Sequence, residues 1–214
     1  CQALRRRSRP VSFALPSAVR AGDTTTAMVD DMAAAGLRYI AFAPESGSPA
    51  VRRRMGKSVD EKHLLGLVRH CHQRAIACQA CFVVGFPGED DSDRAATAAL
   101  ARRLLQAGVD DLSFFIMAPV PGSRCAAENE LESSTPPPPE GLNWSPRWRD
   151  DFPGLARWRQ WRYLEWGLSM GLGGPRRLVD FLASLSSGRY RTKGAMACGW
   201  LLRRALRSST QGRQ

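Results

Sequence analysis

Two short polar segments contain the residues of this chain best suited to bind a ligand. Glu45-Ser46-Gly47-Ser48 combines a carboxylate with two hydroxyls and a glycine, and Gly85-Phe86-Pro87-Gly88-Glu89 combines two glycines with a second carboxylate. A carboxylate accepts charge-assisted hydrogen bonds from ammonium groups or sugar hydroxyls. Glycines let the backbone approach a flat ring, and Pro87 stiffens the loop. These residue types predict a binding site for a polar ligand that carries a planar group.

Each polar segment follows an apolar run, at residues 39–43 in the first case and 81–84 in the second. A third apolar run, at 112–118, leads in the same way into Pro119-Val120-Pro121-Gly122-Ser123. Three such runs indicate parallel strands whose carboxyl ends lie on one edge of a sheet, which we call the rim. Catalytic and binding side chains collect on this edge in α/β folds. The residues expected along the rim are Glu45, Gly85, Pro87 and Pro119.

Helices are predicted between the apolar runs. The first covers residues 24–36, with Asp23 as its N-cap and Gly36 as its C-cap. The second begins after Ser58-Val59-Asp60-Glu61, which has the spacing of a capping box. The third follows an acidic stretch at 90–93, where negative charge suits a helix N-terminus, and runs to Gly108. An earlier strand is expected at 11–15, ending at Pro16-Ser17, with Arg20 just beyond it.

The unit of helix, turn, strand and loop therefore repeats three times between residues 23 and 123. Strands joined by helices form right-handed parallel crossovers. We expect an α/β fold, a fragment of a partial (β/α) barrel of the TIM type with a C-terminal helical extension. Four strands leave a barrel open with an exposed edge, and the chain begins without Met or a signal peptide. We interpret it as a piece of a longer protein.

Three regions are expected: the barrel portion at 1–125, a Pro-rich linker at 126–145 and a basic helical extension at 146–214. The linker contains four consecutive prolines at 136–139, which favour an extended backbone. In the extension, helices are predicted at 155–170, 176–185 and 196–206.

The formal net charge is +11, and most of the excess lies near the C-terminus. A basic surface favours anionic partners such as nucleic acid, but a solvated Arg-rich surface is the simpler interpretation. Six scattered cysteines argue against a disulfide framework and for a reducing compartment, so we expect a cytoplasmic protein. No run approaches the roughly 18 apolar residues of a membrane helix, and no membrane partner is expected.

Two further patterns have competing interpretations. His70-Cys71-His72 with Cys78 and Cys81 could indicate zinc, but His70 and His72 would point about 200° apart on a helix. Residues three apart in a strand also face opposite sides, so buried thiols acting as small apolar groups are favoured. The Trp and Arg residues from 144 to 166 could stack on single-stranded nucleic acid. Helical spacing of Trp158, Trp161, Leu164 and Leu168 favours a packed face instead, with Arg157, Arg159 and Arg162 outside.

The order and spacing of four stretches resemble the radical S-adenosylmethionine (radical SAM) superfamily, especially the branch that often carries a cobalamin-binding domain upstream. The resemblance covers residues 11–123. The stretches that carry it are Ile40-Ala41-Phe42-Ala43-Pro44-Glu45-Ser46-Gly47-Ser48-Pro49, Met55-Gly56-Lys57, Phe82-Val83-Val84-Gly85-Phe86-Pro87-Gly88-Glu89 and Ala118-Pro119-Val120-Pro121-Gly122-Ser123.

The resemblance implies a [4Fe-4S] cluster, held by a Cys-x-x-x-Cys-x-x-Cys motif, that binds S-adenosylmethionine through its amino and carboxylate groups. One electron, supplied by a donor such as a flavodoxin or ferredoxin, then cleaves the sulfonium to a 5′-deoxyadenosyl radical. Cobalamin is a further cofactor that the resemblance allows. The implied cofactor-binding residues are Glu45, Ser46, Gly47, Gly85, Pro87, Gly88, Glu89 and Arg20.

Three of these residues also have structural interpretations. Neighbouring backbone amides could satisfy Glu45, the charge of Glu89 could favour the start of the next helix, and Arg20 could form a surface salt bridge. Lys57 matches a recurrent lysine of the superfamily, although a loop lysine is solvated by default.

The chain departs from the superfamily in one respect, because it contains no Cys-x-x-x-Cys-x-x-Cys. The superfamily places that motif in the first barrel loop, so we expect it upstream of Cys1 and expect this chain alone to be inactive. The predicted function is the C-terminal part of a radical SAM enzyme core. The alternative is a non-catalytic basic module, derived from such a core, that docks RNA or protein.

Overall fold

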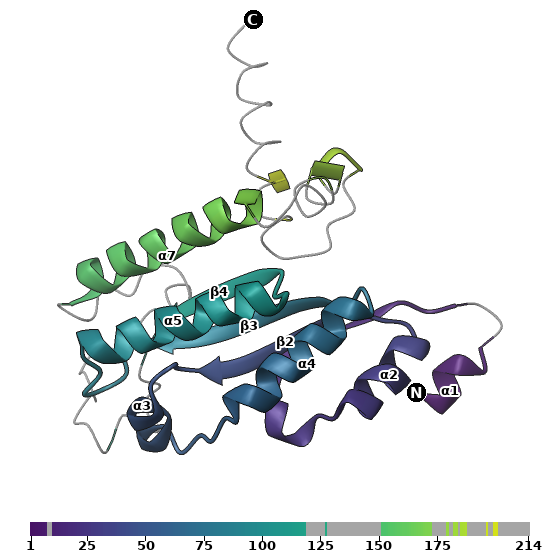
Figure 1. Cartoon of the computed structure of the whole chain (residues 1–214), viewed down its shortest axis with the longest axis horizontal. Coiled ribbons are helices and arrows are strands. Elements are labelled where there is room, and N and C mark those ends of the chain that lie inside the picture. The colour runs from purple at the N-terminus through teal and green to yellow at the C-terminus, as the bar shows by residue number, and fades with distance from the viewer. Residues whose placement is uncertain are drawn as a thin grey trace, which may run out of the picture.

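Four parallel strands form one sheet in the order β1-β2-β3-β4, the order in which they occur along the chain (Figure 1). The computed structural model describes residues 1–7, 10–118 and 151–172, with isolated positions at 127 and between 179 and 200. The strands are β1 (Phe13–Val19), β2 (Leu37–Glu45), β3 (Ala77–Val84) and β4 (Asp111–Ile116). This sequential parallel order, with a helix before each of the last three strands, confirms the predicted α/β fold of the (β/α) type.

Helices α2 (Thr26–Ala34), α4 (Glu61–Gln73) and α5 (Asp91–Ala107) cover one face of the sheet (Figure 1). Short elements complete the barrel portion: α1 (Gln2–Arg5), the 3-10 turn η1 (Ala21–Asp23) and α3 (Pro49–Arg54). The helix α7 (Phe152–Leu172) lies beside α5 and contacts β4. It confirms the helix predicted at 155–170.

The main apolar core lies between the sheet and its helices. Alternate residues of β2, β3 and β4 point into it, and the rings of Phe82 and Phe114 stack with centroids 5.2 Å apart. Trp158 of α7 meets the Phe114 ring edge-on at 5.3 Å. The hydroxyl of Tyr163 accepts a hydrogen bond from the Phe114 amide at 3.1 Å. Helix α7 therefore covers part of β4, the last described strand of the sheet.

The opposite face of the sheet carries a buried row of hydrogen bonds. The Tyr39 hydroxyl donates to Gln79 Oε1 at 2.8 Å, and Gln79 Nε2 donates to Ser113 Oγ at 2.7 Å. Burial, followed by the neighbouring Asp111 carboxylate, raises the pKa of Tyr39 well above its usual range. Tyr39 therefore remains a neutral donor, and the row links β2, β3 and β4 through side chains.

Two predicted helix starts were wrong by about two residues. The N-cap of α2 is Thr25, whose side chain accepts from the Met28 amide at 3.2 Å, whereas Asp23 lies in η1. The N-cap of α4 is Asp60 rather than Ser58, because Asp is an equally good cap and accepts from the His63 amide at 3.0 Å.

The ends of α2 and α5 agree better with the predictions. Gly36 directly follows the α2 C-cap, Ala35, and has a positive φ of 107°. Helix α5 has the expected acidic start, a capping box of Asp90 and Asp93, and it ends at the left-handed Gly108. Both glycines take a backbone conformation that side chains disfavour.

The first strand lies later in the chain than predicted, since β1 begins at Phe13 rather than at residue 11 and runs through Pro16 to Val19. Proline lacks an amide hydrogen but is tolerated on an edge strand, and β1 lies at one edge of the described sheet. Its pairing with β2 is irregular between Leu15 and Val19, where the proline falls.

The packed face of α7 also differs from the prediction. Trp158, Tyr163 and Trp166 pack against the core, whereas Trp161, Leu164 and Leu168 are 64%, 58% and 70% exposed. Apolar residues occur all around this helix, so periodicity alone could not select the packed face. Arg162 was expected outside, yet its guanidinium lies 5.5 Å from the centre of the Trp158 ring.

Several predictions fall on residues outside the described ranges: the loop at 119–123, the linker and the helices predicted at 176–185 and 196–206. The three-region division of the chain thus stays a prediction. Among the helices that the structure describes, none combines the length and the apolar character needed to cross a membrane.

Gly36 should be intolerant of a side chain. A Cβ atom there would lie 1.8 Å from the Val11 carbonyl oxygen, and φ is +107°. We expect Gly36→Ala to lower the free energy of unfolding by about 1–3 kcal/mol or more, as overpacking does. Urea unfolding measures the change. The matched control is Gly66→Ala in α4, where nothing lies within 4 Å, and which should raise stability by up to about 1 kcal/mol. Equal losses in both variants would contradict the steric argument.

Candidate functional site

The two polar segments meet at the same edge of the sheet. Glu45 is the last residue of β2, and Gly85 directly follows β3. The strands are parallel, and Glu45 pairs in register with Phe82 near the end of β3. The structure therefore confirms that Glu45, Gly85 and Pro87 lie along one rim, while Pro119 lies outside the described residues. We call residues 45–48 the Glu45 loop and residues 85–89 the Gly85 loop.

Glu45 has an unusual backbone conformation. The pairing of β2 with β3 is irregular between Phe42 and Glu45, where β2 has one extra residue. The Ser46 amide donates to the Pro44 carbonyl at 2.7 Å, and φ of Glu45 is +62°. A three-residue turn with positive φ at its centre is rare and strained, above all for a residue other than glycine. Such strain persists only where neighbouring contacts enforce it, and it gathers at functional sites.

The Glu45 carboxylate is mostly buried and has a cationic neighbour. Its Oε1 lies 3.4 Å from Nζ of Lys57, and the two side chains are 19% and 50% exposed. The structure thus pairs this carboxylate with a lysine rather than with the backbone amides considered above. Lys57 itself is anchored through its amide, which donates to the Arg52 carbonyl at 2.8 Å.

The other residues of the Glu45 loop pack against α5. Ser46 is buried, and its hydroxyl bonds to Thr97 at 3.1 Å and accepts from the Ser48 amide at 3.1 Å. A Cβ on Gly47 would lie 2.2 Å from the Ala96 carbonyl oxygen. These contacts seat the loop on the helix. Cofactor contact through Ser46 and Gly47 stays a prediction.

The Gly85 loop contains a tight turn that its residue types explain. The Glu89 amide donates to the Phe86 carbonyl at 2.9 Å, with Pro87 second in the turn and Gly88 third at φ +73°. Proline followed by a left-handed glycine is the pattern of a type II turn. Gly85 also has a positive φ, of 76°, and is buried. Both glycines thus take a backbone conformation that side chains disfavour. The approach of a flat ligand to them stays a prediction.

Glu89 closes the Gly85 loop. Its side chain is fully buried, its Oε2 accepts a hydrogen bond from the Gly85 amide, and Arg94 lies 3.7 Å away. The N-cap of α5 is its neighbour Asp90, so Glu89 acts on its own loop rather than as a helix cap. A cofactor contact by Glu89 remains a prediction.

Two arginines of α3 connect the loops. Arg52 is buried; its Nη1 donates to the Ser46 carbonyl at 2.7 Å, and its guanidinium pairs with Glu61 at 3.2 Å. Glu61 also binds Arg103 of α5 at 2.6 Å. Arg54 donates to the Gly88 carbonyl at 2.9 Å. Arg52 thus links the Glu45 loop to α4 and α5, and Arg54 links α3 to the Gly85 loop.

Arg20 lies just beyond β1, as predicted, but on the exposed surface. Its Nε is 3.5 Å from Asp23, and the two side chains are 79% and 69% exposed. This is the surface salt bridge given above as the alternative, a kind of pair that contributes little to stability. Its contact with a cofactor stays a prediction.

The histidines and cysteines of the helical layer have separate surroundings. His70 Nε2 lies 2.7 Å from Asp30, whereas His72 packs beside Gly108. Cys71 and Cys78 are buried in the core, where hydrogen bonding between the two thiols and burial raise the pKa of Cys78. Cys81 is only half-buried. Core thiols and divergent imidazoles agree with the favoured interpretation of this segment.

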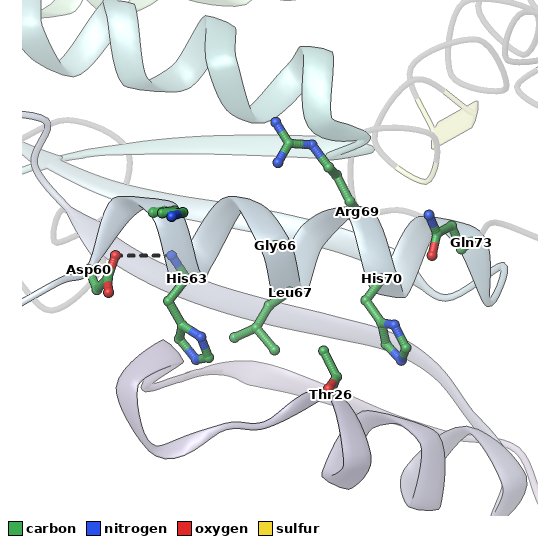
Figure 2. Close-up of a pocket in the computed structure, with 9 residues that line it drawn as sticks. Thr26, Asp60, His63, Gly66, Leu67, Arg69, His70 and Gln73 are labelled. Atoms are coloured by element: carbon green, nitrogen blue, oxygen red, sulfur yellow. Dashed lines mark hydrogen bonds between the residues drawn. The ribbon is translucent and has the colours of Figure 1, made fainter.

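A hollow of about 460 Å³ lies between α4 and the start of α2 (Figure 2). Figure 2 shows His63, Leu67 and His70 directed from α4 toward Thr26. The ring of His63 already contacts the carbonyls of Ala21 and Thr24, at 3.1 and 2.9 Å. None of the predicted site residues lines this hollow. It is separate from the rim.

Sequence reasoning missed the residues that hold the rim together, namely Arg52, Arg54, Asp93 and Thr97. For Thr97 a signal was present, because it interrupts an alanine run at 95–99 in α5. A lone hydroxyl on an apolar helix face needs a hydrogen-bond partner. The arginines of α3 are consecutive, so the sequence could not show which of them is buried.

Fold and site define the class of protein: a (β/α) core with a glutamate of strained backbone and a glycine loop on the rim. Residues 14–101 match the Radical SAM superfamily. The matched segment contains both the Glu45 loop and the Gly85 loop.

Two curated relatives align with about two fifths of the chain. An uncharacterized methyltransferase of Pyrococcus horikoshii is 28% identical over 89 residues, covering 42% of this chain and 19% of the relative. A tRNA-2-methylthio-N(6)-dimethylallyladenosine synthase of Thermus thermophilus is 33% identical over 88 residues, covering 40% of this chain and 18% of the relative. The chain therefore matches about a fifth of the length of each.

Two solved structures show a partial likeness. The radical S-adenosylmethionine methyltransferase TsrM of Kitasatospora setae has a TM-score of 0.41 at 19% identity, over 48% of this chain and 20% of TsrM. Coproporphyrinogen III oxidase (HemN) of Escherichia coli, a radical SAM enzyme, has a TM-score of 0.48 at 19% identity, over 61% of this chain and 29% of HemN.

Asp90 should make the start of α5 sensitive to acid. The Asp93 amide, followed by the Ser92 hydroxyl, lowers the pKa of Asp90 from its usual 3.8. A lowered pKa stabilises the folded state above the usual value, and this contribution is lost as the pH falls through the lowered one. Asparagine caps equally well without titrating. We therefore expect Asp90→Asn to melt like the parent at neutral pH and to lose less melting temperature in acid. Parallel losses would contradict this.

Proposed function

We propose that the rim is the S-adenosylmethionine-binding part of a radical SAM enzyme core, in which Glu45 contacts the cofactor. One observation carries the proposal: the Glu45 carboxylate is held at the end of β2 in a strained conformation, on the same rim as the Gly85 loop. The match of residues 14–101 to the superfamily supports it, because this segment includes both loops.

The chemistry of the rim fits this cofactor. S-adenosylmethionine carries an ammonium, a carboxylate, a sulfonium, two ribose hydroxyls and an adenine ring. The Glu45 carboxylate suits the ammonium or the ribose hydroxyls, and Lys57, 3.4 Å away, supplies a cation for the carboxylate. Gly85 and Gly88, both with positive φ, expose backbone that a planar ring could approach. A carboxylate next to an ammonium group has charges complementary to those of an amino acid zwitterion.

The iron–sulfur cluster does not fit the described residues. Among them there is no group of three His, Cys, Asp or Glu side chains that could hold a metal. Cys71 and Cys78 are buried in the apolar core, and the sequence has no Cys-x-x-x-Cys-x-x-Cys. We therefore propose that the cluster ligands belong to a longer protein of which this chain is one part.

In that longer protein, the cluster would deliver the electron that cleaves the sulfonium to the 5′-deoxyadenosyl radical. A flavodoxin or ferredoxin is the proposed source of the electron. Cobalamin is part of the proposal only as a cofactor of the resembling branch, and none of the described residues is assigned to it. The alternative of a non-catalytic basic module is not favoured, because the superfamily match includes the whole Glu45 and Gly85 loops.

Glu45→Gln tests the cofactor contact. The amide keeps the size of the side chain but loses its charge, and charge-assisted hydrogen bonds contribute roughly 1.5–3 kcal/mol. In the cluster-loaded longer protein, we expect S-adenosylmethionine to bind about ten- to a hundredfold more weakly, with little change in melting temperature. Calorimetric titration measures the affinity.

The matched control for this test is Asp31→Asn, an exposed carboxylate of α2 that pairs with Arg5. It should bind the cofactor like the parent. Unchanged affinity in Glu45→Gln, together with a large loss of melting temperature, would assign Glu45 to the scaffold.

Anaerobic reconstitution tests the assignment of the cluster. With iron and sulfide, this chain should give no stoichiometric [4Fe-4S] absorbance, and a longer protein with the upstream cysteines should give it. The opposite result would be a stable cluster in this chain that disappears when Cys78 and Cys81 are both replaced by alanine. That result would show that these thiols are ligands.

A further inference from the structure

A single hydroxyl of α5 organises the hydrogen bonds of the Glu45 loop. Thr97 is fully buried, and its Oγ1 accepts from the Gly47 amide at 2.9 Å. The same oxygen lies 3.1 Å from Ser46 Oγ and 3.1 Å from the Asp93 carbonyl. Because a carbonyl can only accept, the hydroxyl hydrogen of Thr97 points to Asp93, and Ser46 must donate to Thr97.

These assignments give one continuous chain of donors. The Ser48 amide donates to Ser46 Oγ, Ser46 donates to Thr97, and Thr97 donates to the Asp93 carbonyl. The Gly47 amide is the second donor to Thr97. These groups are buried, so water cannot take the place of a missing partner. Removal of the Thr97 hydroxyl would therefore leave several groups without a hydrogen bond.

Close packing also holds the Glu45 loop against α5. The Gly47 backbone touches α5 at Ala96, which lies on the same helix face as Asp93 and Thr97. Asp93 in turn accepts a hydrogen bond from the Ser48 hydroxyl. Each of residues 46–48 is therefore held on α5. Because Glu45 directly precedes them, these contacts also restrict its backbone.

We propose that Thr97 is a positioning residue, which holds the Glu45 loop so that the Glu45 carboxylate meets S-adenosylmethionine. Thr97 does not itself touch the cofactor but acts through Ser46 and Gly47. The inference rests on the proposed function, because it assigns to Thr97 the geometry of the same contact. It explains how a conformation that glutamate disfavours is kept at the end of β2.

The first experiment follows the loop in the full chain. Thr97→Val keeps the shape of the side chain and removes its hydroxyl, whereas Thr97→Ser keeps the hydroxyl. By NMR, we expect Gly47 amide hydrogen exchange to be roughly tenfold faster or more in Thr97→Val and close to the parent in Thr97→Ser. Thr26→Val, an exposed change in α2, is the matched control and should leave Gly47 exchange unchanged. Equal exchange in all variants would overturn the proposal.

The second experiment measures S-adenosylmethionine affinity in the cluster-loaded longer protein. We expect Thr97→Val to weaken binding roughly tenfold and Thr97→Ser to restore it. Added to Glu45→Gln, Thr97→Val should weaken binding little further, because coupled residues are not additive. If Thr97→Val does not fold, Ser46→Ala removes one donor of the same chain and should give a smaller loss of affinity.

The outcomes separate the two proposals. Parent affinity in Thr97→Val, together with weak binding in Glu45→Gln, would overturn the role of Thr97 and leave the proposed function standing. Parent affinity in Glu45→Gln would overturn the proposed function, and the cofactor-positioning role with it. Weak binding in Thr97→Val that Thr97→Ser does not rescue would show a packing effect and also overturn the inference.

Discussion

The backbone of Gly47 lies so close to the backbone of α5 that no methyl group fits between them. This contact fixes the direction in which the chain leaves β2, and therefore the place where α3 begins. Ser48 can then cap α3, accepting from the Val51 amide, and also bind Asp93 of α5. With α3 in place, Arg52 reaches the Ser46 carbonyl and Glu61, and Arg54 reaches Gly88. The geometry of the rim thus depends on one close approach of two backbones.

The charged residues around the rim differ in how deeply they are buried, and their burial determines which partners they need. Of the three consecutive arginines at the end of α3, Arg52 is buried, and a buried charge requires partners, which Glu61 and the Ser46 carbonyl provide. Arg54 is more exposed and binds the Gly85 loop from outside. Glu45 and Lys57 form a looser pair, at 3.4 Å with half of the lysine exposed. A partly solvated pair of this kind contributes only about 0–1 kcal/mol, so little free energy is lost when it separates.

The sequence was sufficient for the order of strands and helices and for the rim, because apolar runs followed by Gly and Pro loops have strong local signals. Glu45 and the Gly85 loop lie where they were predicted. The N-caps of α2 and α4 were misplaced because several residues nearby are equally good caps, and the choice depends on tertiary contacts. The packed face of α7 could not be read from its period, since Trp158 is packed and Trp161 is exposed on a helix with apolar residues all around. Thr97 binds a residue fifty positions away. Its place in an alanine run indicates that the hydroxyl needs a partner, but the local sequence does not show which residue that partner is.

The spacing of residues along α5 determines which of its side chains reach the rim. Asp90 caps it directly after the Gly85 loop, and Thr97 reaches the Glu45 loop two turns later. Each residue of an α-helix turns the next by about 100°. A deletion or insertion of one residue between Asp93 and Thr97 would therefore rotate the hydroxyl away from Gly47, even if the composition of the helix were unchanged. In related chains, we expect the length of this segment to be fixed while the second half of α5 varies.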